Sequence, residues 1–221
     1  MLFLAVFCGF LAENQREHII ENHREKQFMQ TFLDDIKRDT AEINEDAANW
    51  ISIITHIDSL RIELEKPGVG QDLVLMYRAN ISILFRYTTF RYNDRTIQQL
   101  RNSGNFRLIN RVIADSMMHY DGTVRTSIKD REIIIREIYL ELVHLQNSLF
   151  DSGITERIRK KKSIDTLIYT GPIQNKNNLY QYYNDLFFYK IRVEDLIRRL
   201  LELHKNAINL MKLIKQKYRL E

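Results

Sequence analysis

Apolar residues recur at alternating steps of four and three along two long stretches of the chain. The first series is Met29, Leu33, Ile36, Thr40, Ile43, Ala47, Trp50, Ile54, Ile57, Arg61 and Leu64. The second is Leu179, Tyr182, Leu186, Tyr189, Val193, Leu196, Leu200, Leu203, Ala207, Leu210 and Ile214. This spacing places each series along one side of a helix. Both stretches are therefore predicted to be long helices that pack against partners along their length.

Turn-forming residues separate further helical segments between these two. Pro67-Gly68-Val69-Gly70 ends the first long helix, and a second helix is predicted over residues 71–87. A short helix is predicted from Asn93 or Asp94 to Asn102, and a longer one from Asn110 to about Phe150. Residues 152–178 show no regular pattern.

Two glycines have different expected roles in these segments. Gly104 follows the short helix, at the position where a left-handed residue commonly ends a helix. Gly122 lies within the longer segment, where a glycine costs only about 1 kcal/mol relative to alanine and need not end the helix. The predicted fold is all-α: an elongated up-and-down helical bundle with coiled-coil-like packing, forming one domain over residues 13–221.

The first twelve residues, Met1 to Ala12, are apolar and uncharged, and Glu13 begins a highly charged stretch. A helix needs about 20 apolar residues to cross a bilayer, so this run is too short to do so alone. A signal peptide would carry basic residues before the apolar run, and none is present. Two interpretations remain: the buried start of a helix, or the last part of a transmembrane helix whose earlier residues precede Met1.

Two short blocks carry a resemblance to a known family. They are Gly9-Phe-Leu-Ala-Glu-Asn14 followed by Arg16-Glu-His18, and Leu100-Arg-Asn-Ser-Gly-Asn105 followed by Leu108-Ile109. In residues, order and separation they resemble an uncharacterised family of small bacterial envelope proteins, typical of Bacteroidetes. The resemblance implies a single-pass protein of the inner membrane with a helical, periplasmic domain and no established activity. In that family the apolar segment is longer and follows a short polar start. This difference favours the interpretation of residues 1–12 as the end of a truncated anchor.

Charge is distributed unevenly along the chain. Acidic residues predominate over residues 13–66 and basic residues over 151–221, within a net charge of +4. Pairing between the first and last helices would account for this asymmetry without a nucleic-acid partner. The only cysteine, Cys8, lies in the apolar run, so no disulfide is expected.

Three groups of residues are candidates for metal or anion contact. Glu141 and His144 have the Glu-x-x-His spacing of di-iron bundles, but no second copy is found. His18, Glu21, His23 and Glu25 lie close together in sequence, and a solvated helix face explains them better than a metal site. Arg157, Arg159, Lys160, Lys161 and Lys162 form a basic run that is most simply a solvated loop, with lipid or anion contact as the alternative. No metal or cofactor is predicted.

A dense aromatic set begins the last helix and comprises Tyr180, Tyr182, Tyr183, Phe187, Phe188 and Tyr189. At helical spacing such a set is mostly core, and Tyr180, Tyr183, Phe187 and Phe188 are the candidates for a partner or ligand surface. No nucleophile motif or phosphate loop is found, so an enzyme is not expected. The leading hypothesis is a membrane-anchored interaction or structural module that self-associates or binds an envelope protein. The alternative is a sensory domain that binds a small ligand near the Tyr-rich helix.

Overall fold

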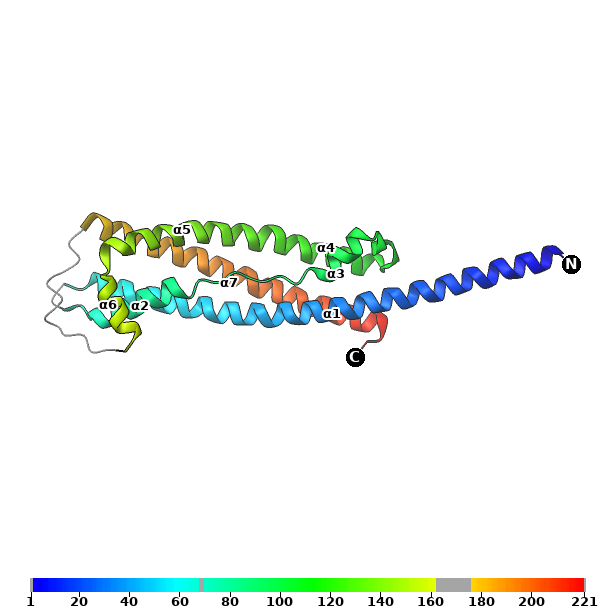
Figure 1. Cartoon of the computed structure of the whole chain (residues 1–221), viewed down its shortest axis with the longest axis horizontal. Coiled ribbons are helices and arrows are strands. Elements are labelled where there is room, and N and C mark those ends of the chain that lie inside the picture. The colour runs from blue at the N-terminus through cyan, green and yellow to red at the C-terminus, as the bar shows by residue number, and fades with distance from the viewer. Residues whose placement is uncertain (1, 68–69, 162–175, 221) are drawn as a thin grey trace. The chain divides into compact units, whose positions relative to one another are not determined.

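The computed structural model describes residues 2–67, 70–161 and 176–220, and gives only the backbone for residues 2–5 and 176. Its regular elements are all helices, and the described residues contain no strand. The longest is α1, Leu2–Glu65, and the second longest is α7, Lys176–Tyr218. Both long helices predicted from the apolar series are confirmed (Figure 1).

Shorter helices connect α1 to α7. They are α2 (Leu73–Phe85), α3 (Arg95–Asn102), the 3-10 helix η2 (Asn105–Leu108), α4 (Arg111–Thr123), the π-helical turn η3 (Val124–Ile128), α5 (Lys129–Leu149) and α6 (Ser152–Arg159). Residues 86–94, between α2 and α3, are not helical. The predicted helix from Asn110 to Phe150 is confirmed as α4, η3 and α5 in succession, with Asn110 accepting a hydrogen bond from the Val112 amide as the N-cap. Residues 152–178, which show no regular pattern in the sequence, include the helix α6 and the first residues of α7, and residues 162–175 of this segment lie outside the described residues.

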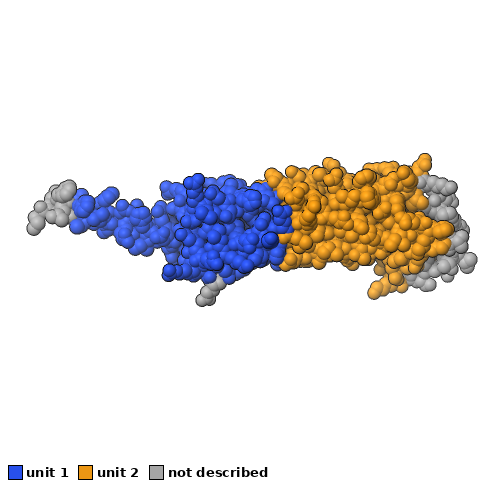
Figure 2. Space-filling model, turned by 180° about the vertical axis from the view of Figure 1, so that it is seen from behind, with its two compact units in different colours: residues 1–42, 91–124, 202–221 blue, residues 43–90, 125–201 orange. Residues whose placement is uncertain are grey.

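The described residues fall into two compact units, which Figure 2 shows in different colours. Unit 1 combines residues 1–42, 91–124 and 202–221. Unit 2 combines residues 43–90 and 125–201. Each unit therefore contains its own portion of α1 and of α7.

The core of unit 1 consists of apolar side chains from α1, α3, α4 and α7. It includes Met29, Leu33, Ile36, Ile97, Leu100, Ile113, Met117, Leu203, Ala207, Leu210 and Ile214. The predicted positions on α1 and α7 are buried here as expected. Four helical segments bury one apolar side each, which is how a helical bundle excludes water from its core.

The core of unit 2 departs from the predicted series at one place on α1. The buried line runs from Trp50 through Ile53, Ile57 and Leu60, and each of these side chains is at most 1% exposed. Ile54 and Leu64, which the alternating series predicts as core, are only half-buried, as is Arg61, which interrupts the apolar series. Two consecutive steps of three, from Ala47 to Trp50 to Ile53, move the buried side of the helix, and a strictly alternating series does not include that change.

The buried-start interpretation of the apolar run is wrong for residues 6–12, whose side chains are exposed. Residues 2–12 are helical and continuous with the rest of α1. Within the described part of the chain, no helix has an apolar stretch of sufficient length to cross a bilayer.

Candidate binding surfaces

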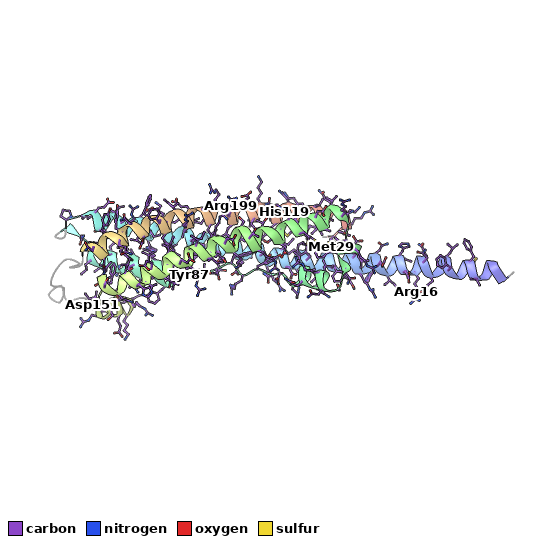
Figure 3. The ribbon with its side chains drawn as sticks, turned by 90° about the horizontal axis from the view of Figure 1, so that it is seen from above. Arg16, Met29, Tyr87, His119, Asp151 and Arg199 are labelled. Atoms are coloured by element: carbon purple, nitrogen blue, oxygen red, sulfur yellow. The ribbon has the colours of Figure 1, made fainter. Side chains whose placement is uncertain are left out.

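The N-terminal part of α1 is exposed to solvent along its described side chains. All side chains from Val6 to Ile20 are exposed, and Val6 and Phe10 are each 67% exposed. Figure 1 shows these first turns extending beyond the other helices of unit 1, and Figure 3 labels Arg16 within them and Met29 where the core begins. We call residues 6–20 the exposed segment. It is an apolar helix surface followed at once by charged residues, which is the expected form of a partner or membrane contact.

A cluster of buried carboxylates in unit 1 binds the residues around the start of α3. Asp39, 1% exposed, accepts hydrogen bonds from the backbone amide of Asn93 at 2.9 Å, from its side-chain amide at 2.8 Å and from the Tyr120 hydroxyl at 2.9 Å. Asp35 accepts from the Thr96 amide at 3.1 Å and pairs with Arg95 at 3.0 Å. These contacts fix the non-helical approach to α3 against α1.

A second pairing in unit 1 completes this carboxylate cluster. Asp121, which is also buried, accepts from the Tyr92 hydroxyl at 3.1 Å and from Arg101 at 2.9 Å. Burial raises the pKa of Asp39 to about 6 despite its three hydrogen bonds, and it also raises the pKa of Tyr120. The cluster is densely hydrogen-bonded and buried, which assigns it a structural role rather than access to a substrate.

The acidic residues of α1 thus bind mainly residues 91–96, whereas the sequence predicted pairing with the last helix. Glu42 pairs with Arg91 at 2.6 Å, and the Asp35 and Asp39 carboxylates bind residues 93–96. The predicted pairing of α1 with α7 does occur in unit 2, where Lys190 contacts Asp58 at 2.7 Å.

A cationic groove lies on unit 2 where α2 and α6 pack together. Its volume is about 780 Å³. It is lined by His56, Val74, Arg78, Ile81, Ser82, Arg86, Ile158, Arg159 and Lys161. The lining combines four cationic side chains and a histidine with three aliphatic side chains, and its described residues include no carboxylate. Such a surface can bind an anion that also has an apolar part.

Two of the cations in this groove are held in place by neighbouring side chains. Arg86 donates a hydrogen bond to the Ser52 hydroxyl at 3.0 Å, and the Arg159 guanidinium lies 5.1 Å from the centre of the Phe85 ring. Partial burial and the positive charge of Arg86 both lower the pKa of His56. The positive charge of Arg86 therefore acts on His56 within the groove.

The predicted basic run is divided by this geometry. Arg159 and Lys161 line the groove, whereas Arg157 and Lys160 do not. Lys160 instead pairs with Glu156 one turn earlier on α6. Lys162 lies outside the described residues. The sequence analysis missed His56, Arg78 and Arg86, although the spacing of Arg78, Ser82 and Arg86 at steps of four places them on one side of a helix.

The aromatic set at the start of α7 separates into core and surface members. Tyr182 and Tyr189 are fully buried, as the core interpretation requires. Tyr180, Phe187 and Phe188 are 71%, 42% and 55% exposed, and Tyr183 is half-buried beneath Arg61, whose guanidinium lies 4.4 Å from the ring centre. We call Tyr180, Tyr183, Phe187 and Phe188 the α7 ridge. Its exposed rings suit a protein contact, and none of them lines the cationic groove.

The candidate metal ligands do not converge. Among the described residues, no group of three or more His, Cys, Asp and Glu side chains is placed to hold a metal ion. Glu141 and His144 are exposed on α5, and Glu141 accepts a hydrogen bond from Gln181 at 3.3 Å. Glu25 accepts from the Asn110 amide at 3.0 Å and from the Tyr218 hydroxyl, so it joins α1 to the start of α4 and the end of α7 within unit 1.

A second open groove lies on unit 1, between α4 and the last part of α7. Its volume is about 410 Å³, and it is lined by Asp115, Ser116, His119, Tyr120, Thr123, Leu203, Asn206, Asn209, Leu210 and Leu213. Its polar lining residues are mostly uncharged, so its lining indicates a class of ligand less clearly than that of the cationic groove does.

Comparison with protein families, with characterised proteins and with solved structures finds no match to this chain. Function is therefore inferred from the chemistry of these surfaces: the exposed segment, the cationic groove and the α7 ridge.

Proposed function

We propose that this chain is a membrane-associated helical interaction module of the bacterial envelope, without a catalytic role. In this proposal the exposed segment of α1 enters the lipid, and the helical units bind an envelope protein or a second copy of the chain. The observation that carries the proposal is the exposure of an apolar helix surface at Val6, Phe7, Phe10 and Leu11.

Physical chemistry supports an apolar environment for this surface. A helix without tertiary contacts is only marginally stable in water, because most helical stability in proteins comes from packing of the apolar side. Burying one large apolar side chain contributes roughly 1.5 to 3 kcal/mol. The charged residues Glu13, Arg16 and Glu17 follow directly, so the headgroup level would lie near residue 13.

Vesicle flotation of the full chain tests this proposal. The variant Phe7→Glu/Phe10→Glu places two charges in the apolar part of the exposed segment. The matched control is Ile51→Glu/Ile62→Glu, which changes two exposed apolar residues of the same helix, 53% and 58% exposed, by the same charge. We expect the first variant to reduce partitioning by more than tenfold, because each lost phenylalanine contact costs more than about 1.4 kcal/mol. We expect the control to partition like the unmodified chain.

Two results would contradict the proposal. One is that the unmodified chain does not float with vesicles at all. The other is that both variants lose partitioning equally, which would mean that added charge, rather than the exposed segment, determines the result.

A further inference from the structure

We infer that the cationic groove of unit 2 is a binding site for a ligand in which a phosphate group is joined to an apolar part. This inference is independent of the proposed function. That proposal rests on residues 6–20, whereas the residues that line the groove lie between His56 and Lys161.

Basic side chains from three helices line this groove. His56 comes from α1, Arg78 from α2, Arg86 from the C-cap of α2, and Arg159 and Lys161 from the end of α6. In the described part of the chain, Arg78, Arg159 and Lys161 have no ion pair. Arg78, Arg86, Arg159 and Lys161 are all exposed to solvent, which screens their mutual repulsion, and the described lining residues supply no carboxylate as a counter-charge. A bound anion would supply that counter-charge.

Helix dipoles explain only part of this arrangement. Cations at a helix C-terminus are stabilised by the orphan carbonyls, and this accounts for Arg86, Arg159 and Lys161 at the ends of α2 and α6. Arg78 and His56 lie in the interiors of their helices, where the dipole has no such effect. The basic residues of the groove are therefore not explained by the ends of two helices alone.

The backbone at the end of α6 determines where Lys161 lies. Lys161 has φ +54°, in the left-handed region that commonly ends a helix, and Arg219 has the same conformation after α7. This conformation costs a non-glycine residue on the order of 1 kcal/mol. It ends α6 with the lysine in the lining of the groove.

The lining specifies the class of ligand. Guanidinium groups bind phosphate through paired hydrogen bonds, and the three arginines and the lysine of the lining provide charge for one phosphate or a diphosphate. Val74, Ile81 and Ile158 add aliphatic surface beside those cations, and Ser82 adds a hydroxyl donor. The volume of about 780 Å³ is within the range of small-ligand sites, about 300 to 1,000 Å³. Free phosphorylated metabolites and phospholipid headgroups share this chemistry.

Binding experiments with paired variants of the full chain test the inference. The groove variant is Arg78→Gln/Arg159→Gln, and the matched control is Arg157→Gln/Arg192→Gln, which removes two exposed arginines that do not line the groove. One arm titrates pyrophosphate at constant ionic strength by calorimetry and follows the His56 imidazole by NMR. The other arm measures flotation with vesicles containing phosphatidate against vesicles of neutral lipid.

We expect the groove variant to weaken binding by about tenfold or more in at least one arm, because each arginine provides charge-assisted hydrogen bonds to phosphate. We expect the control to bind like the unmodified chain. A groove-dependent response to pyrophosphate that perturbs His56 supports a soluble phosphorylated ligand. A groove-dependent response to phosphatidate alone supports a lipid headgroup. Equal binding by the two variants in both arms, or no binding in either arm, would overturn the inference.

Discussion

Asp39 shows how a single buried carboxyl connects pH to the stability of unit 1. Its pKa rises from 3.8 to about 6 because burial disfavours the charged form, and the neighbouring charge of Asp35 adds to the effect. A group whose pKa is higher in the folded state binds its proton more tightly there than in the unfolded chain. Its stabilising contribution is therefore complete below about pH 4 and is lost as the pH rises through 6. A shift of this size corresponds to about 3 kcal/mol.

We predict that Asp39→Asn removes this contribution to the pH dependence. The amide oxygen keeps an acceptor for Asn93 but carries no charge at any pH. The free energy of unfolding, measured by urea titration, should therefore decline less between pH 4 and pH 7 than in the unmodified chain. Asp34→Asn, at a half-exposed position on the same helix, is the control and should leave that slope unchanged. Identical slopes for Asp39→Asn and the unmodified chain would contradict the assignment.

Two buried tyrosines of α7 offer a second comparison between residues. The Tyr182 hydroxyl donates to Asn80, whose amide donates in turn to Gln146 at 3.0 Å, whereas the Tyr189 hydroxyl has no hydrogen-bond partner among the described residues. We predict that Tyr182→Phe destabilises unit 2 by about 1 to 3 kcal/mol, because it leaves a buried acceptor unsatisfied. Tyr189→Phe removes an unsatisfied group and should be neutral or stabilising. Chemical denaturation of both variants measures the difference, and equal losses of stability would refute it.

At the scale of helices, two glycines should respond to alanine with opposite signs. Gly104 has φ +68° at the turn after α3, where a side chain strains the backbone, so Gly104→Ala should destabilise the fold by about 1 kcal/mol. Gly122 lies inside α4, and a Cβ built there meets no atom within 4 Å. Gly122→Ala should stabilise the fold by up to about 1 kcal/mol through helix propensity. Thermal unfolding measures both, and shifts of the same sign would contradict the local conformations described here.

The same scale shows what the sequence could and could not predict. Helices α1 and α7 were predictable because their apolar positions recur over many turns, and the Asn110 cap and the turn at Gly104 because their side-chain chemistry is local. Helix α6 has only eight residues, too few for a period to emerge, and its start depends on the Asp151 carboxylate accepting from the Ile154 amide at 2.9 Å. Short helices of this kind depend on tertiary packing more than on pattern.

The candidate sites were less predictable than the helices. The cationic groove combines a histidine in the last third of α1 with arginines more than twenty residues later and with residues of α6, so only the folded chain brings them together. The basic run from Arg157 to Lys162 contains two residues that line the groove, Arg159 and Lys161. The sequence does not show which of the five basic residues share a surface. The α7 ridge was predicted as a candidate surface, yet only burial distinguishes it from its core neighbours Tyr182 and Tyr189.

At the scale of the whole molecule, each unit presents a surface suited to a different partner. Unit 1 has the exposed segment, an apolar helix surface that begins at the N-terminal end of α1. Unit 2 has the α7 ridge, whose exposed aromatic rings are typical of protein interfaces, and the cationic groove. An interaction module with these surfaces should bind lipid and protein through separate residues, so the two activities should be separable by mutation.

We predict that the α7 ridge mediates self-association independently of the exposed segment. The experiment uses the full chain carrying Phe7→Glu/Phe10→Glu, so that the exposed segment does not drive association, and measures sedimentation velocity over a wide concentration range. Adding Tyr180→Lys/Phe188→Lys should raise the dimer dissociation constant by about tenfold or more, because burial of an aromatic ring contributes more than about 1.4 kcal/mol. Adding Ile51→Lys/Ile62→Lys instead, at similarly exposed positions of α1, should leave dimerisation unchanged. A background variant that stays monomeric would exclude the ridge as a contact. An equal effect of the two pairs would also exclude it, and would assign association to other surfaces of the units.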